Sequence, residues 1–184
     1  MWSLAASREC FYNLRLYRER RWYTQYVVLL ERWMNEENLE IERVRMAEAK
    51  VTWINGGKFL GEDSSKHSVV LSTQDENNAI GMRPSELLLV SLASCTAVDV
   101  VNILQKKRKK LSSLEIEAHA EQDPEPPWPY RKIHLTFHLW GDDLTPKDVE
   151  QAIALSEGKY CSISATLRPQ VNLSTSFELH LDGK

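Results

Sequence analysis

The stretch from Pro84 to Lys110 contains no glycine and no further proline, which predicts one long helix. At 1.5 Å per residue it would span roughly 40 Å, more than the width of a small domain. Apolar residues face nearly every direction between Leu87 and Leu104, so we expect the helix to be buried on most sides. Pro84 suits a first helical turn, and the lysine-rich run 106–110 suits the negative end of the helix dipole. The rest of the chain must therefore supply surfaces that surround this helix.

Short segments rich in β-branched and apolar residues lie on both sides of the helix. Two precede it, with Asn55-Gly56-Gly57 as a turn signal, and two follow it, joined by the proline-rich loop 123–130. The end of the chain predicts a helix capped by Thr145 and ending near Gly158, and then a second short helix before a final strand. The strands are expected at 50–55, 67–72, 114–120, 131–140 and 171–181, and the last short helix at 160–167. This order favours an α+β fold with antiparallel sheets wrapped around a long central helix.

Composition excludes several classes of function. The chain has 23 basic and 26 acidic side chains, a balance that gives no electrostatic case for nucleic acid as the main partner. Polar residues such as Ser91 and Asp99 interrupt the long helix, so we expect no membrane span. The start of the chain lacks the pattern of a secretory signal, and three cysteines do not form a disulfide framework. A reducing, cytoplasmic location with chemically active thiols fits these features best.

A boundary in composition lies near Met46. Residues 1–49 contain no lysine but eight of the twelve arginines, and half of the sixteen aromatic residues fall within the first 33 positions. We therefore divide the chain into a segment 1–45 and a domain 46–184. The first segment is either a genuine helical extension, which would engage a membrane surface or a partner, or an upstream translation with no selected fold. We assign no chemistry to Cys10, which belongs to it.

Cys95 and Cys161 are the candidate reactive residues. Each one taken alone fits a small buried apolar side chain better than a reactive thiol. Their surroundings are more specific, namely Gly81-Met-Arg-Pro-Ser-Glu-Leu-Leu-Leu-Val-Ser-Leu-Ala-Ser-Cys95 and Lys159-Tyr-Cys161. Together with Trp53-Ile-Asn-Gly-Gly-Lys-Phe-Leu-Gly-Glu62, these segments resemble the OsmC/Ohr family, and in particular its small OsmC-like branch.

The resemblance implies an intertwined homodimer with two active sites at its interface. It also implies reduction of organic hydroperoxides in an antioxidant stress response, without a cofactor or a metal. Cys95 would be the thiol that attacks the peroxide and becomes a sulfenic acid, and Cys161 would resolve it as a disulfide. A dithiol reductant, either lipoyl-type or a small thiol, would then reopen that disulfide.

Three departures from the family pattern bear on this chemistry. A free thiol is only about a few per cent ionised at neutral pH, so Cys95 needs a nearby cation. The family supplies an arginine from its N-terminal hairpin, where this chain has Lys58; Arg83, Arg131 and Arg168 are alternatives that the sequence does not rank.

The other two departures concern carboxylates. Ser85 stands where the peroxidase branch commonly has a glutamate, and Glu86 follows one residue later, either in that role or as a residue of the first helical turn. Asp99 lies one turn after Cys95 and disfavours a thiolate there unless it is paired with a cation. These features favour an alternative function, the binding of a small apolar or electrophilic ligand without fast peroxidase activity.

The five histidines do not predict a metal site. His134 and His138 share a strand face but stand about 13 Å apart along the strand, which is too far for one ion. We expect His67, His119 and His180 to be solvent-side strand residues. The run 106–110 has no interleaved aromatic residues, so we interpret it as a solvated helix end rather than a nucleic-acid site.

Overall fold

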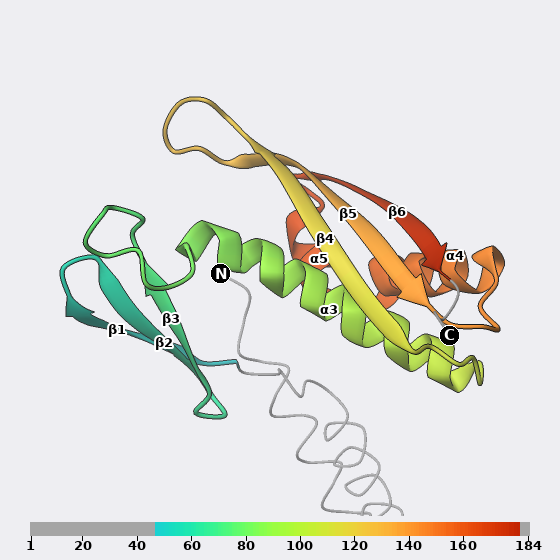
Figure 1. Cartoon of the computed structure of the whole chain (residues 1–184). Coiled ribbons are helices and arrows are strands. Elements are labelled where there is room, and N and C mark those ends of the chain that lie inside the picture. The colour runs from blue at the N-terminus through green and yellow to red at the C-terminus, as the bar shows by residue number, and fades with distance from the viewer. Residues whose placement is uncertain (1–46, 181–184) are drawn as a thin grey trace, which may run out of the picture. The chain divides into compact units, whose positions relative to one another are not determined.

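The computed structural model describes residues 47–180 (Figure 1). The chain divides into two units between Glu48 and Ala49, and the described fold belongs to the second unit. The expectations for segment 1–45 and for Cys10 lie outside the described residues and stay predictions.

The described elements confirm the α+β class. They are β1 (Ala49–Asn55), β2 (Lys58–Asp63), β3 (Ser68–Ser72), α3 (Pro84–Lys106), β4 (Ser113–Gln122), β5 (Tyr130–Trp140), α4 (Pro146–Leu155), the π-helical turn η1 (Ser156–Tyr160), α5 (Ser162–Leu167) and β6 (Asn172–His180). The expected strand order lacked β2. This strand has neither an apolar alternation nor a β-branched run, because Lys58, Gly61 and Glu62 interrupt it.

The first sheet is the antiparallel arrangement β1-β2-β3. Its first turn is the predicted Asn55-Gly56-Gly57, where Gly56 has a φ of +50° that a side chain would strain. The residues after β3 form a loop, and a bridge between Leu71 and Met82 leads the chain into α3. The first sheet is therefore tied to the start of the long helix.

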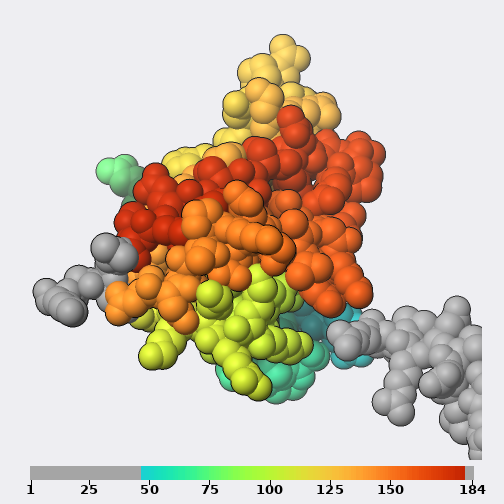
Figure 2. Space-filling view, turned by 90° about the vertical axis from the view of Figure 1, so that its right-hand side faces the viewer, coloured from blue at the N-terminus to red at the C-terminus, as the bar shows by residue number. Residues whose placement is uncertain are grey.

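The second sheet has the order β4-β5-β6, and one of its pairings corrects the expectation of antiparallel sheets. β4 and β5 are antiparallel, but β5 and β6 are parallel. The helical segment between them, α4 to α5, returns the chain to the end of the sheet where β5 began, so β6 runs in the same direction. The loop between β4 and β5 projects from the molecule in both views (Figures 1 and 2).

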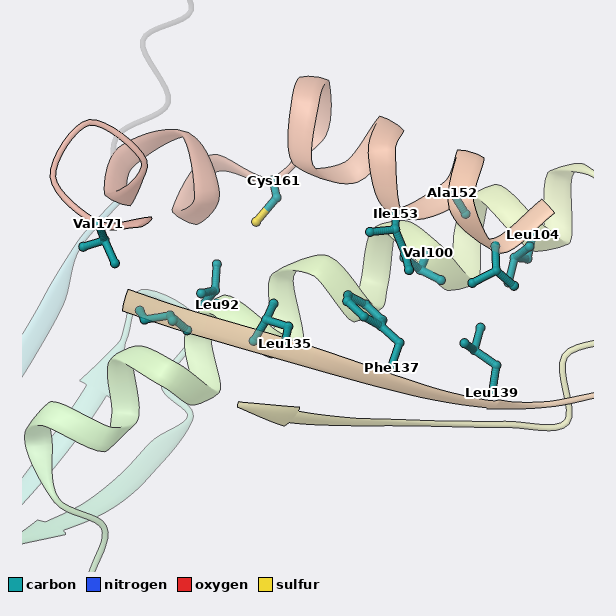
Figure 3. Packing of buried hydrophobic residues seen from close by; sticks show 12 residues of the cluster. Leu92, Val100, Leu104, Leu135, Phe137, Leu139, Ala152, Ile153, Cys161 and Val171 are labelled. Atoms are coloured by element: carbon teal, nitrogen blue, oxygen red, sulfur yellow. The ribbon is translucent and has the colours of Figure 1, made fainter. Parts of the chain in front are cut away.

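The core lies between the inner face of this second sheet, α3 and α4 (Figure 3). Alternate residues of β5 point inward, and one stripe of α3 is buried at four-residue spacing. The buried set is Leu92, Thr96, Val100 and Leu104 on α3, Ile133, Leu135, Phe137 and Leu139 on β5, and Val149, Ala152 and Ile153 on α4. These spacings follow the helical and strand periods, so each element presents one apolar face to the same core.

The lysine-rich run after α3 ties this helix to α4. α3 ends at Lys106, four residues before the expected end, and Lys107 and Lys109 both pair with Asp148 at 2.8 and 2.9 Å. Hydrogen bonding from Lys107, with further bonds from Thr145 and Lys109, holds the pKa of Asp148 well below its usual range. Two of these lysines therefore hold neighbouring helix ends in place.

α3 also meets the length and hydropathy of a membrane-spanning helix. The central helix of a soluble protein can meet the same length and hydropathy criteria, because its apolar residues pack in the core. One stripe of α3 packs against protein, but its other side carries the exposed Val90 and Val98, so the expectation of a helix buried on most sides is wrong for the single chain.

We expect Ala152→Leu to destabilise the fold by about 1–3 kcal/mol, because an added isobutyl group must enter a filled core. Ala152 is fully buried on α4, whereas Ala154 on the same helix is exposed. The matched variant Ala154→Leu should change the free energy of unfolding by less than about 0.5 kcal/mol. Urea unfolding followed by circular dichroism measures both, and equal effects of the two variants would contradict the described packing.

Candidate active site

Cys95 lies in the middle of α3, beside its buried stripe. Its side chain is partly buried and packs against the edge of the core. Asp99 lies one helical turn later on the same face. α3 contacts η1 and α5, so this face of the helix meets the junction between these two segments.

Cys161 occupies that junction. Its backbone is extended, with φ −73° and ψ 105°, which breaks the helical path between η1 and α5. The backbone N–H of Cys161 donates to the Ser156 carbonyl at 2.9 Å, and the N–H of Ser164 donates to Cys161 Sγ at 3.3 Å. The side chain is only 2% exposed and points into the core (Figure 3). The thiol is thus held in one place.

The fold brings the two candidate cysteines together. Sγ of Cys95, Sγ of Cys161 and a carboxylate oxygen of Asp99 all lie within 4.8 Å of one another. A disulfide bond is about 2.05 Å long, so the two sulfurs need to approach by no more than about 2.8 Å. Both cysteines are free thiols in this structure. A small side-chain or backbone movement is therefore enough for a disulfide.

The two thiols differ in their surroundings. Burial raises the pKa of the Cys161 thiol; the side chain and the backbone N–H of Ser164 oppose that shift, and the neighbouring Cys95 adds to it. Cys161 is therefore protonated at neutral pH and a weak nucleophile. Cys95 is the more accessible of the two, which suits it to meet a substrate first.

Asp99 is anchored by a residue that the sequence analysis missed. The hydroxyl of Ser156 donates to the Asp99 carboxylate at 2.8 Å, and Ser156 is fully buried. This bond joins α3 to η1. A signal for it was present, because Ser156 continues the inward-facing spacing of Val149, Ala152 and Ile153 and is therefore a polar residue at a core position.

No hydrogen bond joins a lysine or arginine to Cys95 in the part of the chain that the structure describes. Lys58 lies at the start of β2 and forms no ion pair with a described residue. Arg83 pairs with Glu86 at 3.2 Å, and Arg131 pairs with Asp123 at 2.6 Å. Among the described residues no lysine or arginine pairs with Asp99.

Glu86 does not reach the cysteine pair within one chain. It precedes Cys95 by nine residues, which places it about 13 Å away along the α3 axis and on roughly the opposite side of the helix. Its exposed ion pair with Arg83 spans the first turn of α3. The roles of Lys58 and Glu86 in catalysis stay predictions.

A largely apolar pocket of about 480 Å³ opens between the first sheet and the first half of α3, and Cys95 is not among the residues that line it. The first sheet contributes most of its lining, including Val51 and Leu71, and α3 contributes Leu87 and Ser91. Ser91 and Leu87 precede Cys95 by one and two helical turns, so the three residues share one face. An apolar group bound in this pocket would lie near the Cys95 side of the helix.

The structure is an α+β fold in which two cysteine thiols, those of Cys95 and Cys161, lie close together. The model of the OsmC-like protein family matches residues 74–176. The chain is 36% identical over 132 residues to the protein YhfA of Escherichia coli K12, covering 72% of this chain and 97% of YhfA. The chain therefore belongs to the OsmC-like protein family, as its motifs predicted.

Solved structures agree with this membership. A hypothetical protein from Aquifex aeolicus superimposes with a TM-score of 0.68 at 31% identity, covering 76% of this chain and all of that one. An organic hydroperoxide resistance protein OsmC from Legionella pneumophila gives a TM-score of 0.55 at 14% identity, covering 74% of this chain and 99% of that one. The second likeness shows the shared fold alone.

We expect Ser156→Ala to lower the free energy of unfolding by about 1–3 kcal/mol, because it leaves the Asp99 carboxylate without its hydrogen-bond donor. Ser162→Ala is the control, since Ser162 is exposed on the neighbouring helix α5. Urea titration at neutral pH measures both variants. A loss in Ser156→Ala no larger than in the control would show that this bond contributes little.

Native Cys161 should react with iodoacetamide at least about tenfold more slowly than Cys95 at pH 8, because it is buried and its pKa is raised. The two rates are compared in Cys10→Ser/Cys95→Ser and Cys10→Ser/Cys161→Ser variants. Since the pKa of Cys161 is raised, its rate should continue to rise above a pH of about 8.5 in the folded protein. In urea the two variants should react equally, and equal rates in the native state would contradict the described burial.

Proposed function

We propose that the chain is a thiol-dependent peroxidase that reduces organic hydroperoxides through Cys95 and Cys161. The observation that carries the proposal is the approach of the two sulfurs to within 4.8 Å of each other, from positions 66 residues apart. The apolar pocket on the Cys95 face of α3 supports an organic rather than an inorganic peroxide, because it offers cover for an alkyl or aryl group. The Legionella relative is itself named an organic hydroperoxide resistance protein.

The reaction divides between the two thiols according to their exposure. The thiolate of Cys95 attacks the terminal oxygen of the hydroperoxide, the O–O bond breaks, and the alkoxide leaves as an alcohol after taking a proton. Cys95 is now a sulfenic acid. The Cys161 thiol attacks its sulfur, releases water and forms the disulfide. An external dithiol, lipoyl-type or small, then reduces the disulfide by exchange and is itself oxidised.

A homodimer is part of this proposal. β1 carries the exposed apolar side chains of Val51, Trp53 and Ile54, and α3 carries Val98 at 61% exposure. Exposed apolar surfaces of this kind are typical of a protein interface. A second copy would cover them and bring Lys58 and Glu86 of a partner chain within reach of Cys95, as the family pattern implies. Free thiols of this kind need a reducing compartment, which favours the cytoplasm.

We expect wild type to consume cumene hydroperoxide with dihydrolipoamide as reductant, and Cys95→Ser to fall to the uncatalysed background. Cys161→Ser should reduce about one equivalent and then stop as a sulfenic acid, because Cys95 then has no second thiol within reach among residues 47–180. Peroxide loss and trapping of the sulfenic acid with dimedone measure these outcomes. Cys10→Ser is the control and should turn over like wild type.

One observation favours a second function. The Asp99 carboxylate lies within 4.8 Å of both sulfurs and has no described lysine or arginine as an ion-pair partner, so no paired cation offsets its charge beside the cysteines. The second candidate is therefore an OsmC-like protein that binds a small apolar or electrophilic ligand in the same pocket without fast peroxidase chemistry. Absence of turnover in wild type, together with binding of an apolar ligand that Leu87→Asp abolishes, would replace the first proposal by the second.

A further inference from the structure

Three potential metal ligands meet on the outer face of the second sheet. The parallel register of β5 and β6 pairs His138 with Glu178, and pairs Trp140 with His180. Side chains alternate along a strand, so all four lie on the face opposite the buried Phe137 and Leu139. This cluster is separated by the sheet from the cysteine pair, which lies on the inner side.

The ligand atoms are spaced as a metal ion requires. His138 Nδ1 lies 3.4 Å from Glu178 Oε2, His180 Nε2 lies 3.8 Å from the same oxygen, and the two ring nitrogens are 3.4 Å apart. A tetrahedral zinc ion with bonds of about 2.0–2.1 Å separates its ligand atoms by about 3.3 Å. The three atoms therefore already form a triangle close to one face of such a tetrahedron.

The rings are held in this position by packing. The imidazole of His180 stacks on Trp140 with centroids 4.7 Å apart, and on His138 with centroids 5.7 Å apart. The Glu178 side chain is 60% exposed, so an ion can enter from solvent. Among the described residues, Glu178 pairs only with these two histidines, and no lysine or arginine neutralises its charge.

We propose that His138, Glu178 and His180 bind a divalent transition metal, with Zn²⁺ as the representative ion. Two imidazoles and one carboxylate are a zinc-type donor set that leaves the fourth position to water, and they disfavour Mg²⁺ and Ca²⁺, which prefer all-oxygen sites. The bound ion joins the end of β6 to β5. Nε2 of His138 is buried without a hydrogen-bond partner among the described residues, so this ring lacks the outer bond that usually orients a metal-binding histidine. We therefore expect an affinity about 10–100-fold below that of a fully supported site.

Spacing along a single strand does not reveal this cluster. His138 and His180 are 42 residues apart in the chain. They become neighbours only through the parallel pairing of β6 with β5. His134 lies on the same strand face as His138 but is not part of the cluster. Its two ring nitrogens lie 2.8 Å from the hydroxyls of Ser174 and Ser176.

The test is a Zn²⁺ titration of the full-length chain without an affinity tag, in a Cys10→Ser/Cys95→Ser/Cys161→Ser background that removes competing thiols. Calorimetry should give one Zn²⁺ per chain, and the melting temperature should rise with Zn²⁺ concentration but not with Mg²⁺. Glu178→Gln and His180→Asn should each weaken binding by at least about tenfold. His134→Asn, on the same strand as His138, should bind like the parent.

Glu178→Gln is expected to fold normally, because this side chain is exposed and close in size to its replacement. A loss of Zn²⁺ binding in this variant therefore reports on the site itself. Absence of saturable Zn²⁺ binding in a folded parent would overturn the proposal. Binding that survives both Glu178→Gln and His180→Asn would also overturn it, since the ion would then be held elsewhere on the chain.

Discussion

The packing of α3 against the second sheet and α4 determines where the cysteine chemistry can occur. Its fully buried stripe, Leu92 to Leu104, repeats at four-residue spacing, so the helix cannot rotate about its axis without exposing part of that stripe to water. Cys95 and Asp99 each precede a buried residue, Thr96 and Val100, by one position. The packing of the core therefore fixes where the side chains of Cys95 and Asp99 point. They point toward the junction of η1 and α5, where Cys161 lies.

The hydrogen bond between Ser156 and Asp99 positions η1 against α3, and it also holds a negative charge next to the two cysteines. A charged acceptor bonded to a buried hydroxyl is a strong link between α3 and η1, and it holds the turn that precedes Cys161. The same carboxylate lies within 4.8 Å of both sulfurs, so a negative charge on the attacking sulfur would face a like charge. A cation from a second copy of the chain, such as the proposed Lys58, would remove that repulsion. Assembly and reactivity would then depend on one charge.

Local sequence patterns predicted most of the elements, and long-range pairing explains what they missed. Some signals act within a few residues and can therefore be recognised from the sequence. They are the proline at the start of α3, the Thr145 cap and the Gly56 turn. The parallel direction of β6 is not local, because it depends on where the crossover returns the chain. For the same reason the histidine cluster could not be predicted. The approach of Cys95 and Cys161 was expected from family motifs, whereas spacing alone did not determine it.

Burial of Cys161 affects the step of the proposed cycle in which an external dithiol reduces the disulfide. Since the side chain is only 2% exposed, an external dithiol must attack the Cys95 sulfur of a Cys95–Cys161 disulfide, and Cys161 becomes the leaving group. A leaving thiol departs faster when its pKa is low, and burial raises the pKa of this one. The Ser164 N–H that points at Cys161 Sγ opposes this effect, because it stabilises the developing thiolate. The disulfide is thus protected from general thiols, while hydrogen bonding from Ser164 still assists the release of Cys161, so reduction would depend on a dithiol that reaches the Cys95 sulfur.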